Sequence, residues 1–179
     1  DVLEQHPSFI SLQGTIRTNI GEVSEGLRLL DRAIKGLRDK DDNKELPYAL
    51  HRRSVAYLMA GRYSDAINDT DEVLTLILPN DQKSSIYGHG LFAKGIALTY
   101  LGQLVEALAC FKEALDIYQS IKDRSSVARV WMEIGRTNKM LGNTIEAEAG
   151  YKKALEDYQE TRDFGWQANL NNGLGVLQQ

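Results

Sequence analysis

Residues 101–118 read LGQLVEALACFKEALDIY, and residues 141–158 read LGNTIEAEAGYKKALEDY. Aligned at an offset of 40 residues, the two segments agree at positions that are mostly small, aromatic or aliphatic. The pairs are Leu101/Leu141, Gly102/Gly142, Glu106/Glu146, Ala107/Ala147, Phe111/Tyr151, Ala114/Ala154, Leu115/Leu155 and Tyr118/Tyr158. Self-similarity at a fixed period of about 20–50 residues indicates a repeat architecture, in which each unit buries its apolar face against its neighbours.

The same pattern extends through the rest of the chain. Three series of small residues recur at steps of 40 or 41: Gly21, Gly61, Gly102 and Gly142; Gly14, Ser54, Gly95, Gly135 and Gly175; Gly26, Ala66, Ala107 and Ala147. We therefore expect one helical-repeat domain over 1–179. Its repeats are predicted at about 7–46, 47–83, 84–123 and 124–164, with a partial repeat at 165–179.

The third and fourth repeats carry a recognisable order of residues. In the third, Gly95 is followed by Gly102, Ala107, Phe111 and Ala114, and the fourth repeats that order. This order resembles the tetratricopeptide repeat, which has a small residue within its first helix, a turn glycine, and then Ala, an aromatic residue and Ala in its second helix. The resemblance implies an all-α fold, an α-α superhelix or solenoid of antiparallel helix pairs. It is weaker in the second repeat, where Thr70 and Val73 stand at the last two positions.

The period of 40 is longer than the roughly 34 residues of the standard repeat. The longer form resembles the helical-repeat arm of MalT-like, LuxR-type bacterial transcription regulators, and implies a sensor or partner-binding arm of a multidomain regulator. The chain opens without Met, and its first residues, DVLEQ, read as the end of an earlier helix. We therefore expect a segment of a longer array.

Turn and breaker residues place the helices. The first is predicted from Pro7 to about Asn19, because Pro is tolerated in an opening turn. Others are expected from about Ser24, from Pro47 to about Met59, and from about Ser64 to before Pro79, with charged linkers at 39–45 and 79–85. Five more are expected at 84–100, 104–121, 125–140, 144–160 and 166–179, and no stretch reads as a strand. Gly88 and Gly90 have no place in the repeat pattern, so we expect a loosened start to the helix at 84–100.

Composition excludes several function classes. The 179 residues are 42% hydrophobic and 26% charged, with a net charge of −4, which does not suit direct nucleic-acid binding. There is one cysteine, Cys110, so no internal disulfide is predicted and a reducing, cytoplasmic location is expected. The sequence contains no run of 18 apolar residues, so no membrane-spanning segment is predicted.

Catalytic and ligand-binding motifs are absent from the sequence. It has no phosphate-binding GxxxxGK[ST] loop, no HExxH and no GxSxG. Gly88-His89-Gly90 follows no predicted strand, and His6, His51 and His89 lie in different repeats, so polar surface roles are expected for the histidines. Cys110 is expected to pack against its neighbours. We therefore predict a protein that is not an enzyme, with no catalytic residues, no metal and no cofactor.

A binding face is the remaining candidate site. By resemblance, the first helix of each repeat lines the concave face. On a helical wheel of 125–140, Trp131, Ile134, Gly135 and Asn138 fall on the packing side, and Arg129, Met132, Arg136, Lys139 and Met140 on the other. Equivalent positions in the second and third repeats complete the candidate partner-binding set. That set is Tyr48, His51, His89, Phe92, Tyr100, Arg129, Met132, Arg136 and Lys139.

Two interpretations of these residues stay open. The apolar ones either bind a ligand or pack between repeats, and the cations either bind an anion or form a solvated face. The favoured function is a non-catalytic scaffold for a protein or peptide segment, with an acidic one suited to the cations. The alternative is a sensor arm for a small molecule or peptide signal, with a closed aromatic pocket around Phe92 and Tyr100. An array that serves an enzyme elsewhere in the parent is a third hypothesis. We also expect homo-oligomers through the exposed array end at 166–179.

Overall fold

The computed structural model describes residues 6–77 and 84–161, and within these ranges it contains eight α-helices and no strand. The chain divides into two compact units, Asp1–Gln82 and Lys83–Gln179. This boundary falls where the second predicted repeat meets the third. The predicted helix at 166–179, the opening DVLEQ segment and most of the linker at 79–85 lie outside the described residues.

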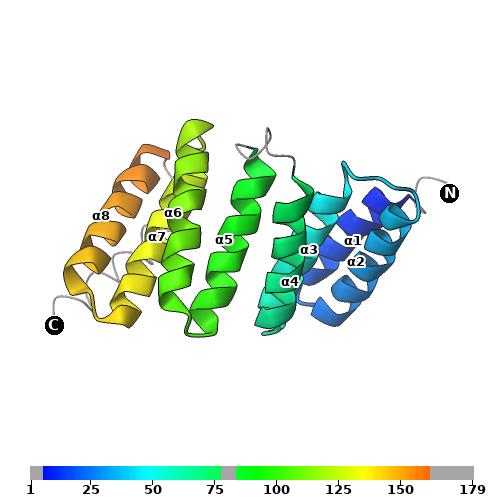
Figure 1. Ribbon diagram of the computed structural model, residues 1–179, viewed down its shortest axis with the longest axis horizontal. Coiled ribbons are helices and arrows are strands. Elements are labelled where there is room, and N and C mark those ends of the chain that lie inside the picture. The colour runs from blue at the N-terminus through cyan, green and yellow to red at the C-terminus, as the bar shows by residue number, and fades with distance from the viewer. Residues whose placement is uncertain (1–5, 78–83, 162–179) are drawn as a thin grey trace. The chain divides into compact units, whose positions relative to one another are not determined.

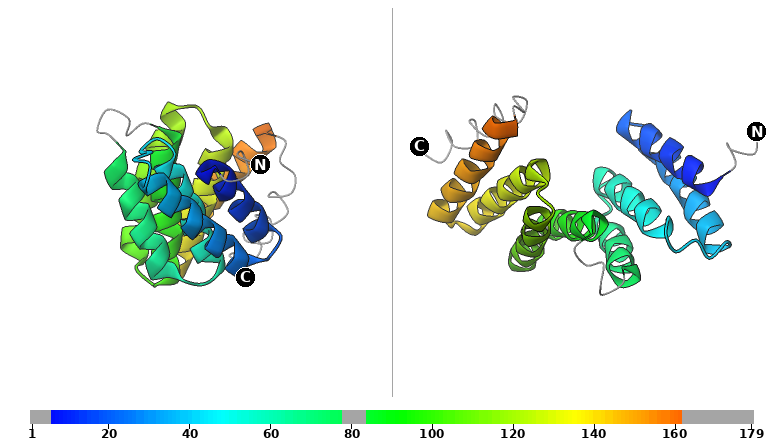
Figure 2. Two further views of the ribbon diagram at one scale, coloured as in Figure 1. Left: turned by 90° about the vertical axis from the view of Figure 1, so that its right-hand side faces the viewer. Right: turned by 90° about the horizontal axis from the view of Figure 1, so that it is seen from above.

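Unit 1 consists of two helix pairs. Its helices are α1 (Pro7–Asn19), α2 (Val23–Arg38), α3 (Leu46–Met59) and α4 (Tyr63–Leu76). Short turns join α1 to α2 and α3 to α4, and α2 also packs against α3 (Figures 1 and 2). The apolar spacing that predicted α2 places Leu30, Ala33, Ile34 and Leu37 in the core, where each is almost fully buried.

Unit 2 repeats this arrangement. Its helices are α5 (Ser85–Tyr100), α6 (Leu104–Ser120), α7 (Arg124–Leu141) and α8 (Thr144–Thr161). Each helix packs against the next along the chain, and Figure 2 shows α7 and α8 side by side. The aromatic position of each repeat is a core residue, because Phe111 of α6 and Tyr151 of α8 are buried with Tyr118 and Tyr158. The predicted all-α arrangement of antiparallel pairs is therefore present in both units.

A glycine in the left-handed conformation lies in the turn that joins the two helices of each pair. The φ angles of Gly21, Gly61, Gly102 and Gly142 are +91°, +71°, +78° and +80°, respectively. A Cβ atom added at any of them would meet nothing within 4 Å, so the backbone conformation, not space, explains these glycines.

A second set of small residues allows the helices of a pair to approach closely. A Cβ at Gly95 would lie 2.5 Å from the Phe111 ring, and one at Gly135 would lie 2.7 Å from the Tyr151 ring. Gly88 has the same role, since its Cβ would lie 3.1 Å from Tyr118. The expected loosened start of this helix was therefore wrong: α5 is helical from Ser85, and Gly88 and Gly90 are buried within it.

Candidate functional site

The predicted site residues of unit 2 come from two neighbouring first helices, α5 and α7. These helices contact each other directly, and the hydroxyl oxygens of Thr99 and Thr137 lie 3.4 Å apart between them. Five predicted residues gather along this junction. We call them the aromatic–arginine stripe: His89, Phe92, Tyr100, Arg129 and Arg136.

Two arginines of α7 lie over two aromatic rings of α5. The guanidinium carbon of Arg129 is 4.9 Å from the centre of the Phe92 ring, and that of Arg136 is 5.4 Å from the centre of the Tyr100 ring. Such cation–π contacts contribute about 0.5–1 kcal/mol each at exposed sites. They use the face of the guanidinium and leave its N–H groups available to an anion.

The rings of Phe92 and Tyr100 differ in burial and therefore in role. Phe92 is only 8% exposed, and its ring centre is 5.9 Å from that of Phe111. It therefore contacts Arg129 from the core side. Tyr100 is 54% exposed, so it both supports Arg136 and presents its own surface. The predicted ligand contact by Phe92 is thus limited to a small exposed edge, and packing accounts for most of this residue.

Glu133 is a site residue that the sequence analysis missed. It lies on α7 between the two arginines, and its side chain is buried. Arg136 Nη2 is 2.6 Å from Glu133 Oε2, an ion pair without hydrogen-bond alignment. Burial raises the pKa of the Glu133 carboxyl, whereas Arg136 and Arg129 act to lower it. Arg136 Nε is buried and has no acceptor among the described residues, whereas the Arg136 side chain as a whole is 38% exposed.

His89 is half-buried at one end of the stripe. Its ring centre is 5.8 Å from that of Tyr118. Burial lowers the pKa of the His89 imidazole, and the positive charge of Arg129 lowers it further. The imidazole is therefore mainly neutral near pH 7, and the positive charge of the stripe comes from the arginines.

Met132 and Lys139 do not join the stripe directly. Met132 is half-buried against a cluster of α7 and α8 that contains Ala128, Tyr151 and Ala154. Lys139 is exposed in the last turn of α7. The other face of α7 agrees with the wheel, because Ile134, Gly135 and Asn138 are buried there.

Tyr48 and His51 lie on α3 of unit 1. Tyr48 is exposed, and His51 is half-buried. The most prominent charged group on α3 is instead Arg53, which makes two hydrogen bonds to Asp69 of α4, at 2.6 and 2.8 Å, and one to Asp31 of α2, at 2.7 Å. Asp69 is buried, so this network is a structural link between three helices.

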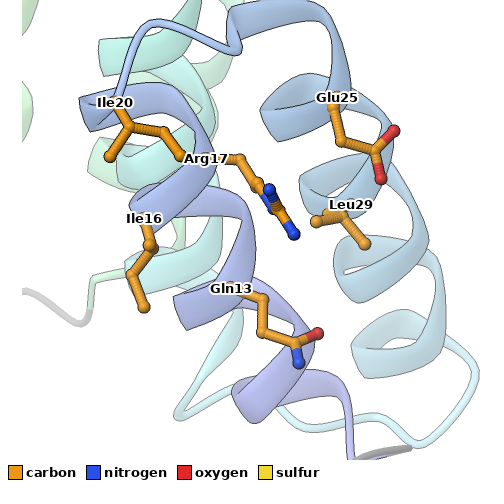
Figure 3. Close-up of a pocket in the computed structure, with 6 residues that line it drawn as sticks. All are labelled: Gln13, Ile16, Arg17, Ile20, Glu25 and Leu29. Atoms are coloured by element: carbon orange, nitrogen blue, oxygen red, sulfur yellow. The ribbon is translucent and has the colours of Figure 1, made fainter.

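Two of the pockets that the described residues form lie away from the stripe. One, in unit 1, has a volume of about 360 Å³; its lining residues are Gln13, Ile16, Arg17, Ile20, Glu25 and Leu29. Figure 3 shows Gln13 and Arg17 of α1 directed toward α2, and Arg17 is paired with Glu22 at 2.8 Å. The other, of about 490 Å³, is bounded by residues of α6, α7, α8 and the α6–α7 turn, including Trp131 and Asp157. Neither contains Phe92 or Tyr100, which the sensor hypothesis had placed in a closed pocket.

Within residues 6–77 and 84–161, no three His, Cys, Asp or Glu side chains gather as a metal ion requires. None of the described helices has the length and apolar character needed to cross a membrane.

Comparison with known proteins places the array in a broader context. Residues 90–160 match the family described as tetratricopeptide repeat. Over 100 residues the chain is 33% identical to Protein KINESIN LIGHT CHAIN-RELATED 1 of Arabidopsis thaliana, a match that covers 55% of this chain and 16% of the plant protein.

Two solved structures share the fold at low sequence identity. A Rap protein complexed with competence and sporulation factor superposes with a TM-score of 0.83 at 17% identity, covering 94% of this chain and 47% of that one. BtubC (BKLC) from P. vanneervenii gives a TM-score of 0.73 at 16% identity, covering 95% of this chain and 78% of that one. The predicted fold, a solenoid of antiparallel helix pairs like that of the tetratricopeptide repeat, is confirmed. The narrower resemblance to MalT-like regulators stays a prediction.

Proposed function

We propose that this chain is a non-catalytic binding module that holds an acidic peptide or protein segment on the aromatic–arginine stripe of unit 2. The observation that carries the proposal is the pair of guanidiniums of Arg129 and Arg136, each lying over an aromatic ring of α5. A guanidinium supported in this way is pre-oriented, so it loses less side-chain entropy when it binds a carboxylate.

The spacing of the arginines defines the ligand further. Arg129 and Arg136 are seven residues apart on one helix, which corresponds to about 10 Å at a rise of ~1.5 Å per residue. A segment in the polyproline II conformation has three residues per turn and advances about 3.1 Å per residue. Two acidic residues three positions apart therefore lie on the same side of it, about 9 Å apart. Tyr100 then offers an exposed ring beside the second carboxylate, and Lys139 adds positive charge further along α7.

The comparisons support a binding role through the fold. One protein of similar fold, a Rap protein, is complexed with competence and sporulation factor. The tetratricopeptide match covers α6 and α7, most of α5 and nearly all of α8. We further propose that the array is an arm of a larger cytoplasmic regulator, as its 40-residue period predicts. An open face is favoured over a closed sensor pocket because Tyr100 is 54% exposed.

A synthetic peptide tests the proposal. The probe carries two Asp residues three positions apart in a Gly/Ser background, and the matched control peptide carries Asn at both positions. Isothermal titration calorimetry with the whole chain is expected to show binding of the Asp peptide only. Arg136→Glu should weaken it about tenfold or more, because it reverses a partly exposed charge. Lys35→Glu, on the exposed surface of α2, is the matched control. Equal affinities for the two variants and the wild type would assign the arginines to a solvated face.

A further inference from the structure

A second feature of unit 2 lies at the edge where its helix pairs turn. Figure 1 shows the α5–α6 and α7–α8 turns at the same edge of the unit. Four apolar side chains are exposed there. We call them the turn ridge: Leu101, Val105, Leu141 and Ile145. Val105 is 69% exposed and Ile145 is 80% exposed, the highest values among the large hydrophobic side chains of the described residues.

The repeats allow the ridge to be compared with the same edge of unit 1. Val105 and Ile145 are each the second residue of their helix, α6 or α8. The second residues of α2 and α4 are Ser24 and Ser64. A β-branched apolar residue has no local advantage over serine in the first turn of a helix, and burial here contributes almost nothing. The two aliphatic residues therefore have no explanation in the folding of unit 2 by itself.

The next residue of each helix shows a matching contrast in charge. It is acidic in all four repeats: Glu25, Asp65, Glu106 and Glu146. In unit 1 an arginine neutralises each one, since Arg28 pairs with Glu25 and Arg62 pairs with Asp65, both at 2.6 Å.

Unit 2 lacks these arginines. Ala109 and Ala149 stand at the position of Arg28, and Gln103 and Asn143 stand at the position of Arg62. Glu106 and Glu146 are exposed, and neither has a salt-bridge partner among the described residues. The edge of unit 2 therefore differs from that of unit 1 in two ways: it has aliphatic side chains in place of serines, and its carboxylates have no neighbouring arginines.

We infer that the turn ridge, with Glu106 and Glu146, is a second docking surface, and that its partner is an amphipathic protein segment carrying Lys or Arg beside apolar side chains. The aliphatic residues bury the partner's apolar face, and the two carboxylates receive its cations. This surface is distinct from the stripe and selects the opposite charge.

The same two charges argue against other occupants of the ridge. An anionic bilayer would be repelled by Glu106 and Glu146. A second copy docked ridge to ridge would bring the carboxylates of both copies together, because a two-fold contact pairs identical surfaces. A basic, apolar segment satisfies both features of the ridge.

A labelled helical peptide of Leu and Lys, with the two residue types on opposite faces, is the probe for this inference. Fluorescence anisotropy with the whole chain is expected to show saturable binding that weakens with added salt. Control peptides replace Lys by Glu or Leu by Ser, and both should bind roughly tenfold more weakly or worse. Binding that is equal for the Leu and Ser peptides would overturn the inference, because charge alone would then explain it.

Variants of the protein complete the test. Val105→Ser with Ile145→Ser restores the residues of unit 1 at exposed positions, so folding is preserved, and it should weaken the Leu/Lys peptide about tenfold or more. Glu106→Gln with Glu146→Gln should remove most of the salt dependence. Ile20→Ser changes an aliphatic residue at the α1–α2 turn of unit 1 that is 61% exposed, and it should have no effect. Unchanged binding in the serine pair would refute the inference. Two other results would also refute it: binding to anionic vesicles that the serine pair abolishes, or dimers in analytical ultracentrifugation that the serine pair abolishes.

Discussion

The guanidinium carbon of Arg136 lies 5.4 Å from the centre of the Tyr100 ring, so a cation of α7 rests on an aromatic residue at the end of α5. The two residues come from adjacent repeats, and neither position is among the small or aromatic positions that define the repeat. Arg136 is also paired with the buried Glu133. Its side chain is therefore oriented from two sides, while its Nε remains without an acceptor among the described residues.

This relationship predicts a difference between two substitutions of Tyr100. Tyr100→Phe keeps the ring under Arg136 and should leave the affinity for the two-Asp peptide within about twofold. Tyr100→Ala removes the ring and should weaken binding by about 0.5–1 kcal/mol, the worth of an exposed cation–π contact. Calorimetry measures both, and urea titration checks that stability is little altered, because Tyr100 is exposed. If Tyr100→Phe binds as weakly as Tyr100→Ala, the hydroxyl and not the ring matters.

The close approach of α7 and α8 predicts a large effect from a single added side chain. Ala147 is completely buried, and its carbonyl oxygen would lie 3.0 Å from a Cβ at Gly135. Ala147→Leu should overpack this contact and cost about 1–3 kcal/mol in the free energy of unfolding. Lys152→Leu on the same helix is the control, since Lys152 is exposed and loses only a surface ion pair with Glu148. Similar urea midpoints for the two variants would contradict the packing.

The network around Arg53 predicts the most sensitive charged position of unit 1. Asp69→Asn should lower the free energy of unfolding by about 2–4 kcal/mol, because it leaves Arg53 partly buried without its main counterion. Asp31 stays as a second partner, which keeps the loss below that of a fully isolated charge. Asp31→Asn is the comparison, and it should cost less than about 1 kcal/mol since Asp31 is exposed. Equal losses in chemical denaturation would show that burial of Asp69 is irrelevant.

The parts of the fold that follow from backbone geometry were predictable from the sequence. The left-handed turns require glycine at Gly21, Gly61, Gly102 and Gly142, so their spacing alone indicated the helix pairs. The contacts of Gly95 and Gly135 with aromatic rings explain why small and aromatic residues recur together. Gly88 was misinterpreted because its position was not recognised as part of the repeat. Ala128, 40 residues later, lies in a buried cluster with Tyr158, as Gly88 lies against Tyr118.

Contacts between repeats were less predictable. The wheel placed Phe92 on the stripe, but its burial depends on Phe111 of α6, and a wheel of one helix contains no information about a second. Arg53 and Asp69 lie 16 residues apart on different helices, at positions that the repeat does not mark. A carboxylate three residues before an arginine, as in Glu133 and Arg136, is the sequence signal that could have identified Glu133.

The last prediction concerns the pH dependence of the stripe. Burial lowers the pKa of His89 from about 6.5, and the charge of Arg129 adds to this. Because the folded pKa lies below the unfolded one, the contribution of His89 to stability is present above pH 6.5 and is lost as the pH falls through the folded pKa. An NMR titration of the imidazole should therefore give a midpoint below 6.5. Arg129→Gln should raise that midpoint, while burial keeps it below the unfolded value.

Unfolding measurements test the same linkage independently. The free energy of unfolding of the wild type should decrease as the pH is lowered below 6.5, and His89→Asn should reduce that slope. Lys35→Gln, on the exposed surface of α2 in unit 1, should change neither the slope nor the His89 midpoint. A midpoint for His89 above 6.5 would show that the imidazole gains an anionic partner in the folded chain. The positive charge at this end of the stripe would then include the histidine, and binding of the two-Asp peptide would strengthen as the pH falls.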